Sequence, residues 1–134
     1  MIMFVAAIVL AGCRKEADER PSKLLAEIEQ LCEAGRYQAA LDSVVVLRSR
    51  FPKAIAERRR ALRLWQEASE KLAQEDIART DSALQATTAQ MTRETRIYER
   101  NMLGVRRDSL QARYEALIGE VRIIRKRMSE LAEQ

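Results

Sequence analysis

The amino-acid sequence predicts an all-α protein, and three observations support that class. Ala, Leu, Glu, Arg and Gln are frequent among its 134 residues, as they are in long helices and coiled coils. Only four Gly and two Pro interrupt them, and aromatic residues make up 4%, which is too few for the turns and strands of a β-rich fold. Apolar residues also recur at spacings of three and four, the period of an amphipathic helix.

The first element is a short apolar segment that ends just before Cys13. Residues 2–10 are too few to span a bilayer as a helix, which needs about 20 apolar residues. The small residues Ala11 and Gly12 then fit the cleavage site of a secretory leader.

The stretch Leu10-Ala11-Gly12-Cys13 resembles the lipobox of bacterial lipoproteins. The resemblance implies a signal peptide over residues 1–12, cleavage before Cys13, and a lipid on the Cys13 thiol that anchors the protein in a membrane of the cell envelope. The run KEADE at 15–19 loosely resembles the surface-export signal of some Gram-negative lipoproteins, which implies the outer membrane, facing the periplasm or the surface. The alternative is a cytoplasmic protein in which residues 2–10 form a helix packed in a soluble core and Cys13 is buried.

The charged run RKEADER after Cys13 cannot enter a bilayer and is interpreted as a solvated tether. Cys32 is the only other cysteine. With Cys13 lipidated, no disulfide within the chain is possible. We expect Cys32 to be a small buried apolar residue, with a reactive thiol as the alternative.

Two helices are expected next, separated by Gly35. Ser22 is expected to cap the first helix at its N-terminus, and Gly35 is expected to end it. Pro52 is expected in the first turn of a third helix, where its missing N–H costs nothing. The apolar face of the first helix consists of Leu24, Leu25, Ile28, Leu31 and Cys32; that of the second consists of Tyr37, Ala40, Leu41, Val44, Val45 and Leu47.

The run LCEAGRYQAALDSVVVLRSRFP is similar to one tetratricopeptide repeat (TPR), a helix pair that binds proteins. The matching positions are Gly35 and Tyr37 at the turn, Ala40, Val44 and Leu47 on the second helix, and Pro52 at the end. A single repeat cannot bury its own apolar faces. We therefore expect Leu62 and Trp65 of the third helix to cover it, with Trp65 as a packing anchor and a ligand platform as the alternative.

Residues 53–103 contain no Pro or Gly and predict a long helix. Two apolar seams follow, and they do not share a heptad frame. The first contains Ile77, Leu84, Met91, Tyr98 and Val105, with Asp81, Thr88, Thr95 and Met102 between them; the second contains Leu110, Tyr114, Leu117, Val121, Ile124, Met128 and Leu131. Because the frame breaks around Gly104, we predict an antiparallel hairpin that turns there, with Asp108 or Ser109 capping the returning helix. The alternative is one continuous helix that forms a dimer.

Net charge and composition limit the function. The 24 basic and 20 acidic residues give a net charge of +4, a mixed surface that is not typical of nucleic-acid binding, and there is no His. We therefore expect no enzyme activity, no cofactor, no metal site and no nucleic-acid partner. The two basic clusters are interpreted as solvated helix faces or as patches for anionic lipid or an acidic partner: Arg58, Arg59, Arg60 and Arg63, and Arg122, Arg125, Lys126 and Arg127.

These observations divide the chain into four parts. They are a signal peptide over 1–12, a lipidated tether over 13–22, a TPR-like helical unit over 23–73, and a coiled-coil hairpin or continuous helix over 74–134. The expected function is a non-catalytic protein-interaction scaffold, held to a membrane by the lipid on Cys13, with an unknown protein partner or a second copy in a homodimer. A structural coiled-coil spacer in the envelope is the alternative, besides the cytoplasmic protein.

Overall fold

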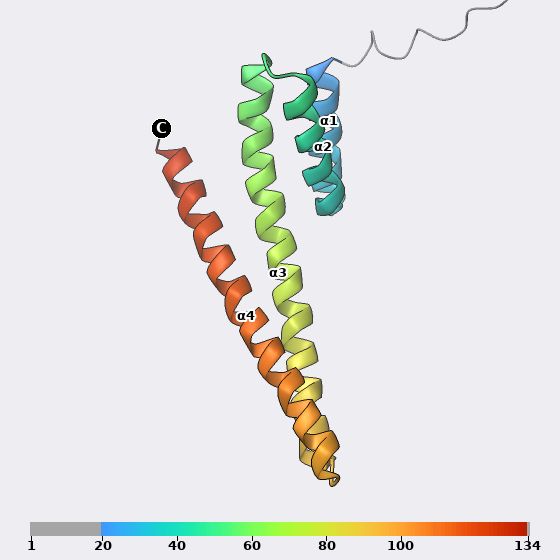
Figure 1. Ribbon diagram of the computed structural model, residues 1–134. Coiled ribbons are helices and arrows are strands. Elements are labelled where there is room, and N and C mark those ends of the chain that lie inside the picture. The colour runs from blue at the N-terminus through green and yellow to red at the C-terminus, as the bar shows by residue number, and fades with distance from the viewer. Residues whose placement is uncertain (1–19, 134) are drawn as a thin grey trace, which may run out of the picture.

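The computed structural model describes residues 20–133, and this part of the chain contains helices and no strand, so the predicted all-α class is confirmed. Figure 1 shows a short helical pair beside the start of a much longer one. Within residues 20–133, the hydropathy of the four helices gives no candidate for a membrane-spanning segment. The four helices are α1 (Pro21–Glu33), α2 (Tyr37–Arg50), α3 (Ile55–Arg93) and α4 (Ile97–Ala132).

The turn between α1 and α2 depends on Gly35, as the sequence predicts. Gly35 has a φ of 69°, which lies in the left-handed region that only Gly adopts without steric cost. The Gly35 N–H donates to the Cys32 carbonyl at 3.1 Å, and the Arg36 N–H donates to the Leu31 carbonyl at 2.8 Å. These two bonds form a Schellman motif, which satisfies carbonyls that the end of α1 leaves without intrahelical partners.

Two helix starts differ from the prediction. Ser22 does not cap α1, because Pro21 is already the first helical residue and Arg20 occupies the cap position. The fixed φ of Pro suits that first position. Pro52 lies in the turn before α3, which begins only at Ile55, so it stands outside the helix rather than in its first turn.

The core of the N-terminal half lies where α1 and α2 pack against the start of α3. Ile28 and Leu47 are completely buried, and Ala61 of α3 closes the cluster. Trp65 packs against this core, as predicted. Leu62 does not: it is 37% exposed and lines a surface cavity with Arg48 of α2 and Ile55 of α3. The partly buried residues around the cluster are Leu24, Leu25, Leu31, Cys32, Leu64 and Trp65.

The second half is an arm made of two long helices. The 39 residues of α3 span about 58 Å at 1.5 Å per residue. The chain then reverses, and α4 runs back along α3 and diverges from it toward the C-terminus (Figure 1). Because α3 is unbroken from residue 55 to residue 93, the two parts of the molecule share one helix.

The prediction of a turn at Gly104 is wrong: the arm turns at Glu94–Arg96. Gly104, Asp108 and Ser109 all lie inside α4, so neither Asp108 nor Ser109 is a cap. A single Gly costs a helix only about 1 kcal/mol, and the packing of α4 on α3 outweighs that cost.

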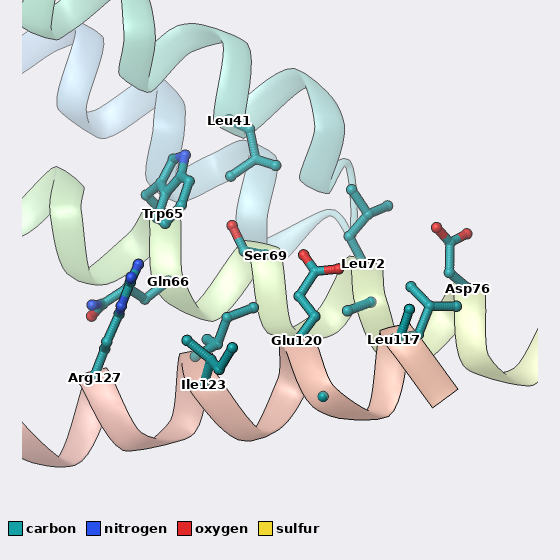
Figure 2. Close-up of a pocket in the computed structure, with 14 residues that line it drawn as sticks. Leu41, Trp65, Gln66, Ser69, Leu72, Asp76, Leu117, Glu120, Ile123 and Arg127 are labelled. Atoms are coloured by element: carbon teal, nitrogen blue, oxygen red, sulfur yellow. The ribbon is translucent and has the colours of Figure 1, made fainter. Parts of the chain in front are cut away.

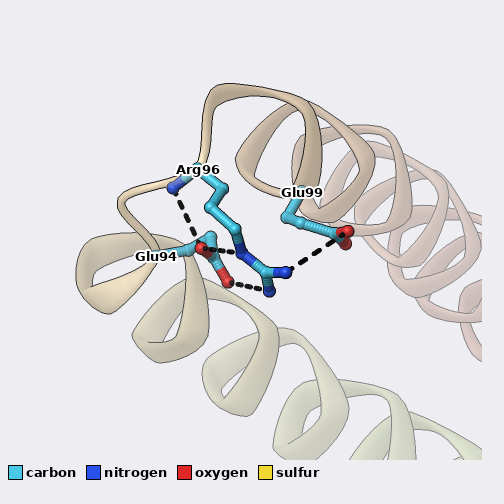
Figure 3. Close-up of polar contacts among 3 residues, drawn as sticks. All are labelled: Glu94, Arg96 and Glu99. Carbon is cyan, nitrogen blue, oxygen red and sulfur yellow. Dashed lines mark hydrogen bonds and ion pairs between the residues drawn. The ribbon is translucent and has the colours of Figure 1, made fainter.

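Side chains rather than a Gly or Pro define the true turn (Figure 3). The Glu94 carboxylate accepts the backbone N–H of Arg96 at 3.0 Å and its guanidinium at 3.1 and 3.2 Å. Arg96 Nη1 also lies 3.9 Å from Glu99 Oε1 in the first turn of α4. Hydrogen bonds from Arg96, through its side chain first and its backbone second, lower the pKa of Glu94 below its usual 4.5.

The broken heptad frame has a different explanation from a turn. The second seam is the face of α4 that packs on α3: Leu117, Val121 and Ile124 are buried and its other four residues are half-buried. Of the first seam, only Ile77, Leu84 and Met91, which lie on α3, belong to that interface. The positions between them are occupied by Thr80 and Thr87, and not by Asp81 and Thr88 as predicted. Tyr98, Met102 and Val105 lie on a different face of α4, exposed to solvent.

Candidate protein-binding surface

An open groove runs between α3 and α4 beneath α2. Its volume is about 590 Å³. Its walls are mainly apolar, with Trp65 and Leu72 from α3, Leu117 and Ile123 from α4, and Leu41 from α2 (Figure 2). The groove forms because α4 diverges from α3 in this half of the arm. Ile123 is 56% exposed at its edge, so apolar surface remains open to a partner.

Charged side chains mark the two ends of the groove. Arg127 lies with Trp65 and Gln66 at one end, and Asp76 lies with Leu117 at the other (Figure 2). Asp76 already interacts with Arg79 and, at 3.7 Å, with Arg113 of α4. In contrast, Glu120 and Arg127 make no ion pair or hydrogen bond with any residue of the described chain. A partner can therefore pair with both charges without breaking an existing contact.

The groove continues into a stripe along α4 that we call the outer stripe. Its positions alternate by four and three residues over more than six helical turns, and none of them is charged. The stripe consists of Tyr98, Met102, Val105, Ser109, Ala112, Ala116, Gly119 and Ile123. Its last three residues also line the groove, while Tyr98 at the other end is 72% exposed.

The geometry of this surface suits a helical partner. A spacing of four and three keeps one face of a helix toward a neighbouring helix, and small residues such as Ala116 and Gly119 allow close approach. The large exposed side chains of the stripe are Tyr98, Met102 and Val105 at one end and Ile123 at the other, and exposed apolar surface of this kind is where proteins bind partners. The α4 helix thus carries one apolar face packed on α3 and a second, uncharged stripe that is largely exposed.

Cys32 is free and half-buried on α1. Burial raises the pKa of its thiol, and the nearby Glu67, Glu29 and Glu33 raise it further. The thiol therefore stays protonated at neutral pH, where only the thiolate is a strong nucleophile. This environment favours the packing interpretation over a reactive cysteine.

The first basic cluster is only partly paired. Arg58 donates to the Pro52 carbonyl at 2.6 Å, and Arg60 Nε lies 2.5 Å from Glu29 Oε1 of α1. The Arg60–Glu29 contact is an ion pair whose geometry does not make a hydrogen bond. In the second cluster, Arg125 bridges to Glu70 of α3 at 2.6 Å. Both pairs join different helices, which sequence spacing could not show.

The predicted lipidation site, Cys13, lies outside the described residues, as do the leader and most of the tether. Within residues 20–133 no group of three or more His, Cys, Asp or Glu side chains is placed to hold a metal ion. The chain matches no protein-family model, no curated protein and no solved structure. The groove and the outer stripe were not predicted as one surface, although the spacing of the stripe is visible in the sequence.

Proposed function

We propose that this chain is a lipoprotein of the bacterial cell envelope that acts as a non-catalytic scaffold and binds a helical segment of a partner protein. The observation that carries the binding part is the groove and its continuation, the outer stripe. Together they leave Tyr98, Met102, Val105 and Ile123 exposed on one helix. Completely burying a large apolar side chain contributes about 1.5–3 kcal/mol, so these four are the residues expected to contribute most to binding.

The tethering part of the proposal rests on Leu10-Ala11-Gly12-Cys13. A diacylglyceryl group on Cys13 would hold the chain at a membrane, because each buried methylene contributes about 0.8 kcal/mol and several chains together bind firmly. The first described helix begins at Pro21, eight positions after Cys13. The outer membrane is the proposed location.

Replacing each cysteine in turn tests the tether. The wild-type chain and Cys32→Ala, which removes the other thiol, should incorporate an alkyne-tagged fatty acid and fractionate with the envelope. Cys13→Ala should do neither. If Cys13→Ala stays as firmly membrane-bound as the wild type, or the wild-type chain carries no lipid, the tether is wrong.

Photo-crosslinking in cells tests the binding surface. A benzophenone amino acid at Met102 or Ile123 should yield one and the same crosslinked partner, and Val105→Glu should abolish both products. The same probe at Val45, which is 62% exposed on α2, is the matched control and should give no product. Equal products from all three positions would contradict a specific surface. A partner identified as a second copy of the chain would favour the structural spacer.

A further inference from the structure

The end of the molecule around the α2–α3 loop carries a concentration of positive charge. Residues 48–63 contain seven basic side chains and a single acid, a net charge of +6, whereas the whole chain has only +4. This segment, which we call the basic end, covers the last turn of α2, the loop and the first turns of α3. The basic end therefore carries more net positive charge than the whole chain, and a second basic run at 122–127 lies on α4.

Much of this charge is not neutralised by the rest of the described chain. Arg48, Lys53, Arg59 and Arg63 are exposed and make no ion pair or hydrogen bond with residues 20–133. Arg58 and Arg60 contact Pro52 and Glu29. Structural salt bridges therefore explain only part of the cluster.

The basic end also presents apolar surface. Ile55 is 64% exposed, and a shallow cavity of about 230 Å³ lies among Arg48, Ile55, Arg58, Arg59 and Leu62. Ile55 thus places an aliphatic side chain directly among the arginines. This arrangement is typical of a surface that inserts apolar groups between lipid headgroups while cations bind the phosphates.

The position of the basic end points to the surface that it meets. In Figure 1 the α2–α3 loop lies at the same end as the start of α1, opposite the Glu94–Arg96 turn. The chain from Cys13 therefore enters the fold beside the basic end. Residues 14–20 span at most about 24 Å when extended, so a membrane that holds Cys13 is within reach of these arginines.

We propose that the basic end rests on an anionic lipid surface, with Arg48, Lys53 and Arg59 at the phosphate groups and Ile55 in the interface. This proposal builds on the tether proposed above and adds a second, electrostatic contact. Each Lys or Arg near an anionic bilayer contributes about fivefold in affinity. A lipid chain together with a basic patch is a common combination for stable attachment. An acidic protein is the competing partner, and its position would have no reason to coincide with the tether.

The test places a benzophenone amino acid at Ile55 of the full-length chain, bound to phosphatidylcholine vesicles with or without phosphatidylglycerol. Mass spectrometry then measures lipid adducts. We expect adducts in the anionic vesicles, at least about fivefold fewer without phosphatidylglycerol or at high salt, because salt screens exposed charges. The probe at Tyr98, on the far end of the arm, should give few adducts under all conditions.

Two charge-reversal variants distinguish an effect of the basic end from an effect of the net charge of the protein. Arg48→Glu with Arg59→Glu should reduce the Ile55 adduct at least about fivefold. Arg122→Glu with Lys126→Glu makes the same change in net charge on α4 and should leave the adduct unchanged; circular dichroism checks the fold of both. Equal loss in both variants, adducts that do not depend on phosphatidylglycerol, or a protein adduct at Ile55 in cells would overturn the proposal. Adducts that persist in Cys13→Ala would support the lipid contact even if the tether itself is wrong.

Discussion

The two halves of the molecule are held together by different kinds of interface. In the N-terminal unit, Ile28, Val44 and Leu47 are at most 1% exposed, and three helices converge on them. In the arm, α3 contributes Gln66, Ala73, Thr80 and Thr87 to the interface, and no large side chain there is fully buried. The difference indicates that the N-terminal unit is the stable anchor of the fold. The interface of the arm is buried less completely, and the groove lies where α4 diverges from α3.

Leu47→Ala should have the largest effect, because it removes a completely buried side chain from the core of the N-terminal unit. We expect the free energy of unfolding to fall by about 3 kcal/mol, measured by urea unfolding followed by circular dichroism. Val45→Ala on the same helix, at an exposed position, should change it by less than about 0.5 kcal/mol. Similar losses in both variants would contradict the assigned core.

Leu117→Ala should have a smaller and more local effect on the arm. Leu117 is 9% exposed, so the expected loss is about 2 kcal/mol. Hydrogen exchange should become faster in α4 and in the facing part of α3, while α1 and α2 keep their protection. Ile123→Ala, on the exposed edge of the groove, is the control. Equal acceleration across all four helices would show that the two halves unfold as one unit.

Glycine substitutions should have opposite signs in the two halves. Gly35→Ala should destabilise the protein by about 1 kcal/mol, because its φ of 69° is costly for any residue with a Cβ. Gly104→Ala should stabilise it by about 0.5–1 kcal/mol, since the new methyl group would meet only Met91 Cε at an ordinary 3.8 Å. Thermal unfolding measures both. A stabilising Gly35→Ala, or a destabilising Gly104→Ala, would contradict the turn positions.

The smallest expected effect is the pH dependence of the Glu94–Arg96 turn. Because the pKa of Glu94 is lowered in the fold, the turn contact is fully present above pH 4.5 and is lost as the pH falls through the lower folded value. NMR titration of the Glu94 carboxyl should give a midpoint below 4.5 in the intact protein and a midpoint closer to 4.5 in Arg96→Ala. A midpoint at or above 4.5 in both would show that the contact does not form in solution.

The sequence predicts the end of a helix correctly where a single residue determines it. Gly35 could be identified as a turn because a left-handed residue at the end of a helix selects Gly. The turn at Glu94–Arg96 could not, since it contains neither Gly nor Pro and depends on a carboxylate that binds the backbone and side chain two residues later. Short side-chain contacts of this kind have no simple sequence signature.

The heptad frame shows a second limit of sequence reasoning. A frame break near Gly104 can mean a turn, or a helix with two faces that each pack against something. Periodicity gives the angle between Val105 and Leu110 but does not say which of them meets α3. Only the structure shows that Leu110 is half-buried and Val105 exposed. The heptad pattern therefore placed Tyr98, Met102 and Val105 in the interior of the arm, whereas the structure exposes all three.

The unbroken course of α3 has a mechanical consequence. Because α3 runs without a break from the N-terminal unit to the Glu94–Arg96 turn, its length fixes the distance between that unit and the turn. Adding seven residues to each of α3 and α4 would lengthen the arm by about 10 Å and return every side chain to nearly its original face of the helix. The length of the arm can therefore change in steps of two helical turns without any change in the N-terminal unit.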